Sequence, residues 1–62
     1  MGVGDLLVLS NSQSTGWKDG TIGICIQVEL VGRLFKLYWL YMPTGEEVPF
    51  WEEEIELLDK EG

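Results

Sequence analysis

The sequence lacks histidine altogether and has little cysteine or basic charge, with one cysteine and four Lys or Arg residues among 62. A single thiol cannot form an internal disulfide, and the absence of histidine argues against a metal site. So few basic residues cannot neutralise many phosphates, which disfavours nucleic acid and anionic membranes as partners. No apolar run approaches the roughly 20 residues that span a bilayer. The first residues also lack the features of a signal peptide. We therefore expect a soluble, cytoplasmic protein without a cofactor.

The chain is short and its charge is uneven. Sixty-two residues make one domain (1–62), and such a domain buries only about 60% of its unfolded surface. Association with another subunit is the remaining source of stability once disulfides and metals are excluded. The net charge of −7 lies entirely in residues 46–62, because acidic and basic residues balance in residues 1–45. An acidic segment of this kind favours solubility and attraction to basic partners.

Two adjacent runs alternate with the period of two that is typical of strands. In residues 22–30 the isoleucines share one face, and Cys25 lies on the other. Residues 34–42 are apolar on both faces. We assign the isoleucine face to the core, opposite Phe35, Leu37 and Trp39. That assignment directs Tyr38, Leu40 and Met42 outward, on the same face as Lys36.

Turn chemistry separates four predicted strands, at residues 5–9, 21–30, 34–42 and 47–51. The turns contain Asp19-Gly20, Gly32 and Pro43-Thr44-Gly45. Residues 52–59 fit either a helix or a strand. We favour a short helical turn near residues 52–54 followed by a strand, because a fifth strand could pair with the first and remove exposed edges. The sequence thus predicts an all-β, five-stranded small barrel.

Several short motifs resemble those of SH3-like small barrel proteins. They are Gly4-Asp5-Leu6, Gly20-Thr21-Ile22-Gly23-Ile24, Leu37-Tyr38-Trp39, Gly45 and Trp51-Glu52-Glu53-Glu54-Ile55-Glu56-Leu57. The chain is similar in particular to short uncharacterised members encoded by tailed bacteriophages and marine environmental sequences. A phage origin would place the protein in the host cytoplasm. This resemblance implies a fold and no catalytic residues, since the barrel hosts many unrelated roles.

The predicted outward face of residues 34–42 is the first candidate site. Contiguous exposed apolar side chains usually mark an interface. We therefore expect a non-enzymatic structural or interaction protein that forms a homo-oligomer through Tyr38, Leu40 and Met42. The alternative to a partner is that the chain itself covers this face.

A second candidate site consists of aromatic residues near the acidic segment: Trp17, Tyr41, Phe50 and Trp51. Aromatic surfaces beside carboxylates suit basic or proline-rich segments, which makes a peptide-binding module the alternative function. Packing is the competing interpretation for such large side chains. Cys25 has no neighbouring base and is expected to be structural. The acidic run lacks a calcium-loop pattern and is interpreted as a solvated edge.

Overall fold

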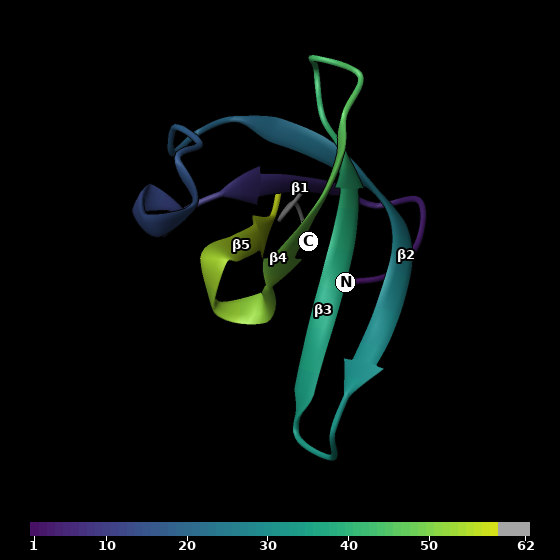
Figure 1. Cartoon of the computed structure of the whole chain (residues 1–62). Helices are drawn as coiled ribbons and strands as arrows, with labels where there is room; N and C mark the ends of the chain where they lie inside the picture. Colours follow the sequence, from purple (N-terminus) through teal and green to yellow (C-terminus); the bar gives the residue numbers. More distant parts are fainter. Residues whose placement is uncertain (59–62) are drawn as a thin grey trace.

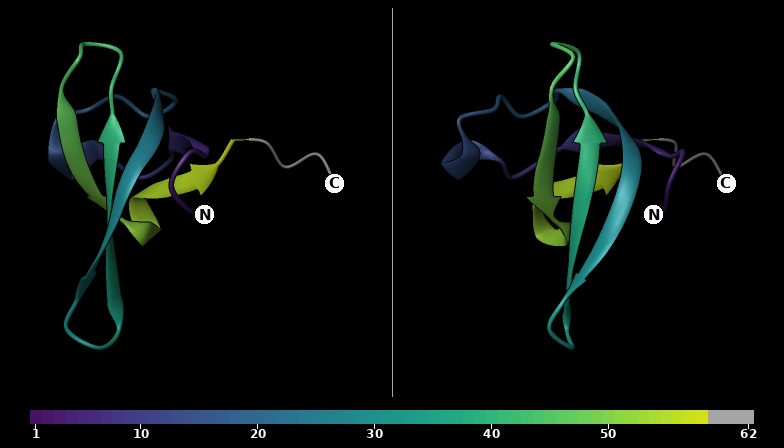
Figure 2. Two further views of the ribbon diagram at one scale, coloured as in Figure 1. Left: turned by 90° about the vertical axis from the view of Figure 1, so that its right-hand side faces the viewer. Right: turned by 45° about the vertical axis from the view of Figure 1, so that its right-hand side comes forward.

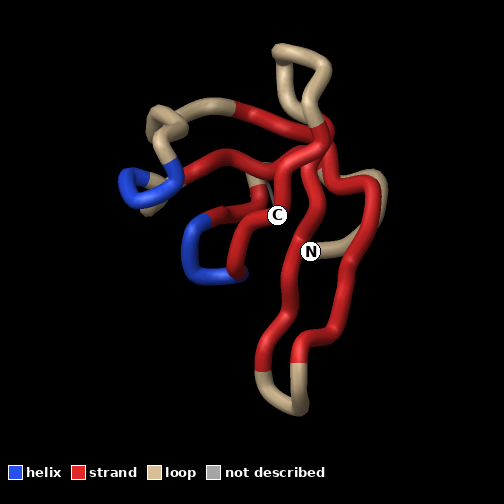
Figure 3. The backbone as a smooth tube through the Cα atoms, in the orientation of Figure 1, coloured by secondary structure: helices blue, strands red, loops and turns tan. Residues whose placement is uncertain are grey.

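The computed structural model describes residues 1–58 and contains one antiparallel sheet (Figure 1). Its elements are β1 (Leu6–Leu9), η1 (Gln13–Thr15), β2 (Ile22–Val31), β3 (Phe35–Tyr41), β4 (Glu47–Trp51), η2 (Glu52–Glu54) and β5 (Ile55–Leu57). The all-β prediction is confirmed, and the short helical turn does precede a last strand. The two 3-10 turns are blue in Figure 3, and η1 was not predicted. Asp59, the end of the predicted last segment, lies outside the described residues.

The strands lie in the order β4-β3-β2-β1-β5. The expected pairing of the last strand with the first is present, with Leu7 opposite Leu57 and Leu9 opposite Ile55. Predicted closure of the barrel is not observed, because β4 and β5 are the two edges of the sheet. The turn η2 separates these two strands, and β5 pairs with β1 alone among the described residues.

The two strands of the β2–β3 hairpin are the longest of the sheet, with ten and seven residues. β1 pairs only with residues 22–24 of β2, whereas β3 pairs with β2 as far as the Val31–Phe35 pair. The distal part of the hairpin therefore projects beyond the other strands (Figures 1 and 2). Its turn begins at Gly32, whose φ of 68° is a conformation that glycine adopts without a Cβ penalty.

A β-bulge interrupts the alternation of β2. Cys25 pairs with Leu40 and Gln27 pairs with Trp39, which leaves Ile26 as an extra residue without a register partner. An extra residue reverses which face the following side chains occupy. Val28 is consequently on the core side and packs against the core, whereas Ile22 and Ile24 point the other way and are exposed.

The core is built from side chains of all five strands. Its buried members are Leu7, Leu9, Cys25, Tyr38, Leu40, Met42, Phe50 and Ile55, with Trp17, Val28, Val48 and Leu57 packed around them. These positions alternate along β1 and β3, as expected for strands with one face covered. Leu7 and Leu9 of β1, and Tyr38 and Leu40 of β3, together with Met42 directly after β3, make up most of this cluster.

Two hydrogen-bond networks stabilise the segments that connect the strands. Ser12 is fully buried, and both its backbone N–H and its hydroxyl donate to Oδ1 of Asp19, over 2.9 and 2.8 Å. Near η2, the backbone N–H of Trp51 donates to the buried Glu54 carboxylate over 2.9 Å. The Glu54 carbonyl in turn accepts from the backbone N–H of Ser10 over 3.0 Å. These hydrogen bonds join the two ends of the long β1–β2 connection, Ser12 to Asp19, and also attach that connection to η2.

Candidate functional site

The structure reverses the two faces of β3. Tyr38, Leu40 and Met42 are buried, with exposed fractions of 2%, 0% and 0%. The prediction that these three side chains form an exposed interface is therefore wrong. The assignment of the isoleucine face to the core is wrong for the same reason, since Ile22, Ile24 and Ile26 are all exposed.

Small residues on β2 explain why this face is inside. Gly23 and Cys25 point toward the core, and Cys25 lies opposite Leu40 in the ladder. A Cβ atom built on Gly23 would lie 2.9 Å from Sδ of Met42 and 3.1 Å from Cβ of Leu40. The space that Gly23 leaves is thus filled by the long side chains of the neighbouring strand. Protein interiors are closely packed, so the side chains of neighbouring strands must fit together in volume. This fit, and not the size of the side chains on one strand, decides which face is buried.

The opposite face of the sheet exposes apolar side chains. Within residues 1–58 twelve large hydrophobic side chains are exposed, among them Ile22, Ile24 and Tyr41 on this face, whereas eight hydrophobic residues form the buried core. Single exposed apolar residues are ordinary, but contiguous ones mark interfaces. The apolar side chains that a partner could contact therefore lie on the outer face of β3 and not on its inner face.

One part of this surface carries no charge. A shallow groove of about 280 Å³ crosses β1, β2 and the end of β3, and it is lined by Leu6, Ile22, Gly23, Ile24, Tyr41, Met42 and Pro43. Its exposed members Leu6, Ile22, Ile24, Tyr41 and Pro43 are here called the outer patch. The ladder holds the patch together, because Ile24 lies opposite both Leu6 and Tyr41.

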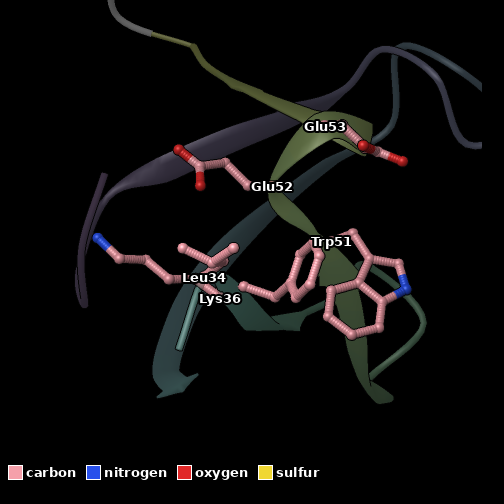
Figure 4. Close-up of a pocket in the computed structure, with 6 residues that line it drawn as sticks. Leu34, Lys36, Trp51, Glu52 and Glu53 are labelled. Atoms are coloured by element: carbon pink, nitrogen blue, oxygen red, sulfur yellow. The ribbon is translucent and has the colours of Figure 1, made fainter. Parts of the chain in front are cut away.

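A second groove lies beside the projecting hairpin (Figure 4). It has a volume of about 480 Å³ and is lined by Leu34, Phe35, Lys36, Trp51, Glu52 and Glu53, which we call the hairpin groove. The Phe35 and Trp51 rings meet edge to face, with centroids 6.2 Å apart and planes at 73°. This arrangement is favourable for two aromatic rings. The hairpin groove therefore combines an aromatic wall with two carboxylates and one amine.

The outer face of β3 connects these two surfaces. Phe35, Leu37, Trp39 and Tyr41 alternate along it, from the hairpin groove to the outer patch. Trp39 is held in place by a hydrogen bond of 3.1 Å from its ring Nε1 to Glu29. The outer face is thus one continuous apolar strip with different polar surroundings at its two ends.

The four predicted ligand-binding aromatics do not come together. Phe50 is fully buried, and Trp17 is half-buried against the core, so Phe50 is wrong as an exposed ligand residue. Tyr41 and Trp51 are exposed on the outer face. Tyr41 lies opposite Glu47 and Trp51 opposite Leu37, which places them near opposite ends of the β3–β4 ladder. Neighbouring residues such as Phe50 and Trp51 point to opposite faces of a strand and cannot line one cage.

Two members of the hydrophobic core, Cys25 and Tyr38, are titratable. Burial raises the pKa of the Cys25 thiol above its usual range, although a contact of 3.7 Å with the Gln27 carbonyl acts in the opposite direction. Burial also raises the pKa of the Tyr38 phenol, and the Glu52 carboxylate adds to that shift. Both groups therefore stay protonated at neutral pH. Within residues 1–58, no three His, Cys, Asp or Glu side chains lie close enough together to hold a metal ion.

Five exposed residues that line the two grooves were not predicted from the sequence as site residues: Leu6, Ile22, Ile24, Leu34 and Phe35. For Ile22 and Ile24, the signal that could have found them is the pairing of small with large side chains on β2 and β3, where Gly23 and Cys25 lie beside Leu40 and Met42. For Leu34 the sequence offered no such signal.

No helix in residues 1–58 combines the length and the apolar character needed to cross a membrane. Comparison with family models, curated proteins and solved structures found no match to this chain.

Proposed function

We propose that this protein is a non-enzymatic interaction module that associates with copies of itself through the outer patch. The observation that carries this proposal is an apolar, uncharged groove on the surface of a domain with a small core. A C2 interface brings the same patch together from both subunits, and an uncharged patch does so without placing like charges against each other. Burial of this patch would also add to the stability of a chain that has little core of its own.

A stable dimer of this chain would bury a substantial part of its surface. A standard interface buries about 800 Å² per partner, which is roughly a fifth of the 4298 Å² that the chain exposes. The outer patch alone is smaller than such an interface. The apolar strip along the outer face of β3 extends it, since Leu37 and Trp39 continue from Tyr41 along the same face. A dimer interface centred on Ile24 would therefore be mostly apolar.

We also propose the finer classification as an SH3-like small barrel. It is supported by the order of five short strands, the 3-10 turn η2 before the last strand, and the pairing of β5 with β1. Relationship to tailed-phage proteins, and a place in the host cytoplasm, stay predictions from the sequence motifs.

The test is the mass in solution of the Ile24→Asp variant, measured by light scattering over a concentration series. Ile24 is exposed, so the variant should fold, whereas Leu40→Asp would place a carboxylate in the core. Ile24 is 43% exposed, so burying the rest of it contributes roughly 0.6–1.3 kcal/mol of the 1.5–3 kcal/mol of a whole side chain. A C2 dimer loses this twice, so the dissociation constant should rise roughly tenfold to a hundredfold.

Val3→Asp is the matched control, because Val3 is exposed and lies outside both grooves. It should associate as the wild type does. A wild-type protein that stays monomeric at every concentration would refute self-association. Equal masses for wild-type and Ile24→Asp oligomers would show that the outer patch is not the interface.

A further inference from the structure

The tip of the β2–β3 hairpin presents apolar and cationic groups together. Leu34, Leu30 and Phe35 are 85%, 72% and 61% exposed, and they are three of the four most exposed large hydrophobic residues in the described chain. Arg33 lies in the turn between the two strands and is itself exposed. The distal part of the hairpin projects beyond the other strands, and within residues 1–58 its ladder joins only β2 and β3 (Figure 2).

The hairpin groove presents the complementary combination. Its aromatic wall is formed by Phe35 and Trp51, and Glu52 and Glu53 stand at its edge (Figure 4). Neither of these two carboxylates makes a hydrogen bond or ion pair within residues 1–58. A segment with an apolar side chain next to a cation could therefore pack the apolar group on the aromatic wall and pair the cation with the carboxylates.

We propose that the hairpin tip of a second copy of this chain occupies the hairpin groove, reciprocally in both subunits. Leu34 of each subunit then packs on the aromatic wall of its neighbour, and Arg33 pairs with Glu52 and Glu53. This proposal rests on the proposed function, and it specifies how the self-association is oriented. The outer face of β3 runs from this groove to the outer patch, so one interface can include both.

The distribution of positive charge favours a second copy over an unrelated basic peptide. Only Lys18, Arg33 and Lys36 are cationic side chains within residues 1–58, and Arg33 lies in the hairpin turn beside Leu34. The tip of a second copy therefore supplies both the cation and the apolar side chain that the groove suits. In a C2 pair each Arg33 is directed to the carboxylates of the neighbour, and every such contact is made twice, whereas a single basic peptide makes it once.

A charge-exchange experiment tests this orientation. The variants are Arg33→Glu and the double variant Glu52→Arg with Glu53→Arg, each examined alone and as an equal mixture. Each variant alone should associate roughly tenfold more weakly than wild type, or more weakly still, because the attractive charge contacts at both ends of the C2 pair become repulsive. The mixture should regain wild-type affinity as a heterodimer, since each tip then meets a groove of opposite charge. Native mass spectrometry distinguishes the heterodimer from the two homodimers by mass.

Lys18→Glu is the matched control for net charge. It changes the charge of the subunit by the same amount as Arg33→Glu, but Lys18 lies in the β1–β2 connection, outside both grooves. Its affinity should be close to that of the wild type. Circular dichroism of each variant confirms that the fold is retained.

The possible results separate this inference from the proposed function. A monomeric wild type refutes both. If the wild type associates, and Arg33→Glu weakens it no more than Lys18→Glu does, the hairpin orientation is refuted and self-association stands. A mixture that forms no heterodimer also refutes the orientation. Binding of an arginine-rich synthetic peptide, with a shift in tryptophan emission and no effect on dimer mass, would assign the groove to another protein.

Discussion

Gly23 is the position at which the reversed faces of the sheet can be tested most directly. In the structure it points into the core, and its φ is not in the left-handed region, so a side chain there is not excluded by the backbone. A Cβ would lie 2.9 Å from Sδ of Met42, 3.1 Å from Cβ of Leu40 and 3.2 Å from the carbonyl oxygen of Tyr41. The Met42 side chain can move, but the other two atoms belong to or adjoin the backbone of β3. Gly23→Ala should therefore force the two central strands apart.

The expected cost follows from overpacking. An added methyl group in a well-packed core typically costs about 1–3 kcal/mol. A domain of this length has a total stability of roughly 3–9 kcal/mol, so the loss is a large fraction of the whole. For a domain of this size it corresponds to a fall of roughly 5–20 °C in Tm. If Gly23 pointed outward, the same substitution would instead stabilise the protein by about 0.4–1 kcal/mol, because alanine restricts the unfolded chain.

The assay is thermal and urea unfolding followed by tryptophan fluorescence, at one fixed protein concentration. Gly2→Ala is the control, because a Cβ on Gly2 meets nothing within 4 Å and its φ is not in the left-handed region. Its stability should match that of the wild type. A Gly23→Ala variant as stable as wild type, or more stable, would refute the inward orientation of Gly23 and the face assignment that depends on it.

Two further predictions concern titratable groups. Hydrogen bonds from the backbone and hydroxyl of Ser12 lower the pKa of Asp19 below its usual 3.8. The resulting stabilisation is complete above the unfolded pKa and is lost as the pH falls through the lower folded value. Thermal melts between pH 6 and pH 2 should show a smaller acid dependence in Asp19→Asn, and identical dependence would contradict this role. Burial raises the pKa of Cys25, so iodoacetamide at pH 7.5 should label it slowly in the folded protein and quickly in denaturant. Fast labelling of the folded protein would show that the thiol is accessible.

The positions of the strands could be predicted because their signals are local. The period of two in residues 22–30 and 34–42, and the Pro43-Thr44-Gly45 turn, mark strands and their connection regardless of what surrounds them. In the structure the Gly45 N–H donates to the Met42 carbonyl over 2.8 Å, as that turn requires. Local signals left residues 52–59 open between helix and strand, and the helical turn followed by a strand was predicted from the expected pairing of a fifth strand with the first, which the structure contains.

The composition also determined the kind of chemistry that is available. One thiol, no histidine and four Lys or Arg residues underlie the expectation of a non-enzymatic protein without a nucleic-acid partner, and this stays a prediction. By contrast, the sites predicted from Tyr38, Leu40, Met42 and Phe50 failed, because each depended on knowing which face of a strand is exposed. Alternation divides side chains into two sets and does not say which set is inside.

Tertiary structure alone decided that question. The bulge at Ile26 exchanges the faces partway along β2, and the small side chains of Gly23 and Cys25 leave room for Met42 and Leu40. Both effects depend on contacts between strands that are separated in sequence. Burial is a property of the packed volume shared by several strands, so the pattern within any one strand does not determine it. The outer patch exists because Ile22 and Ile24 were left outside, on the face opposite Gly23 and Cys25.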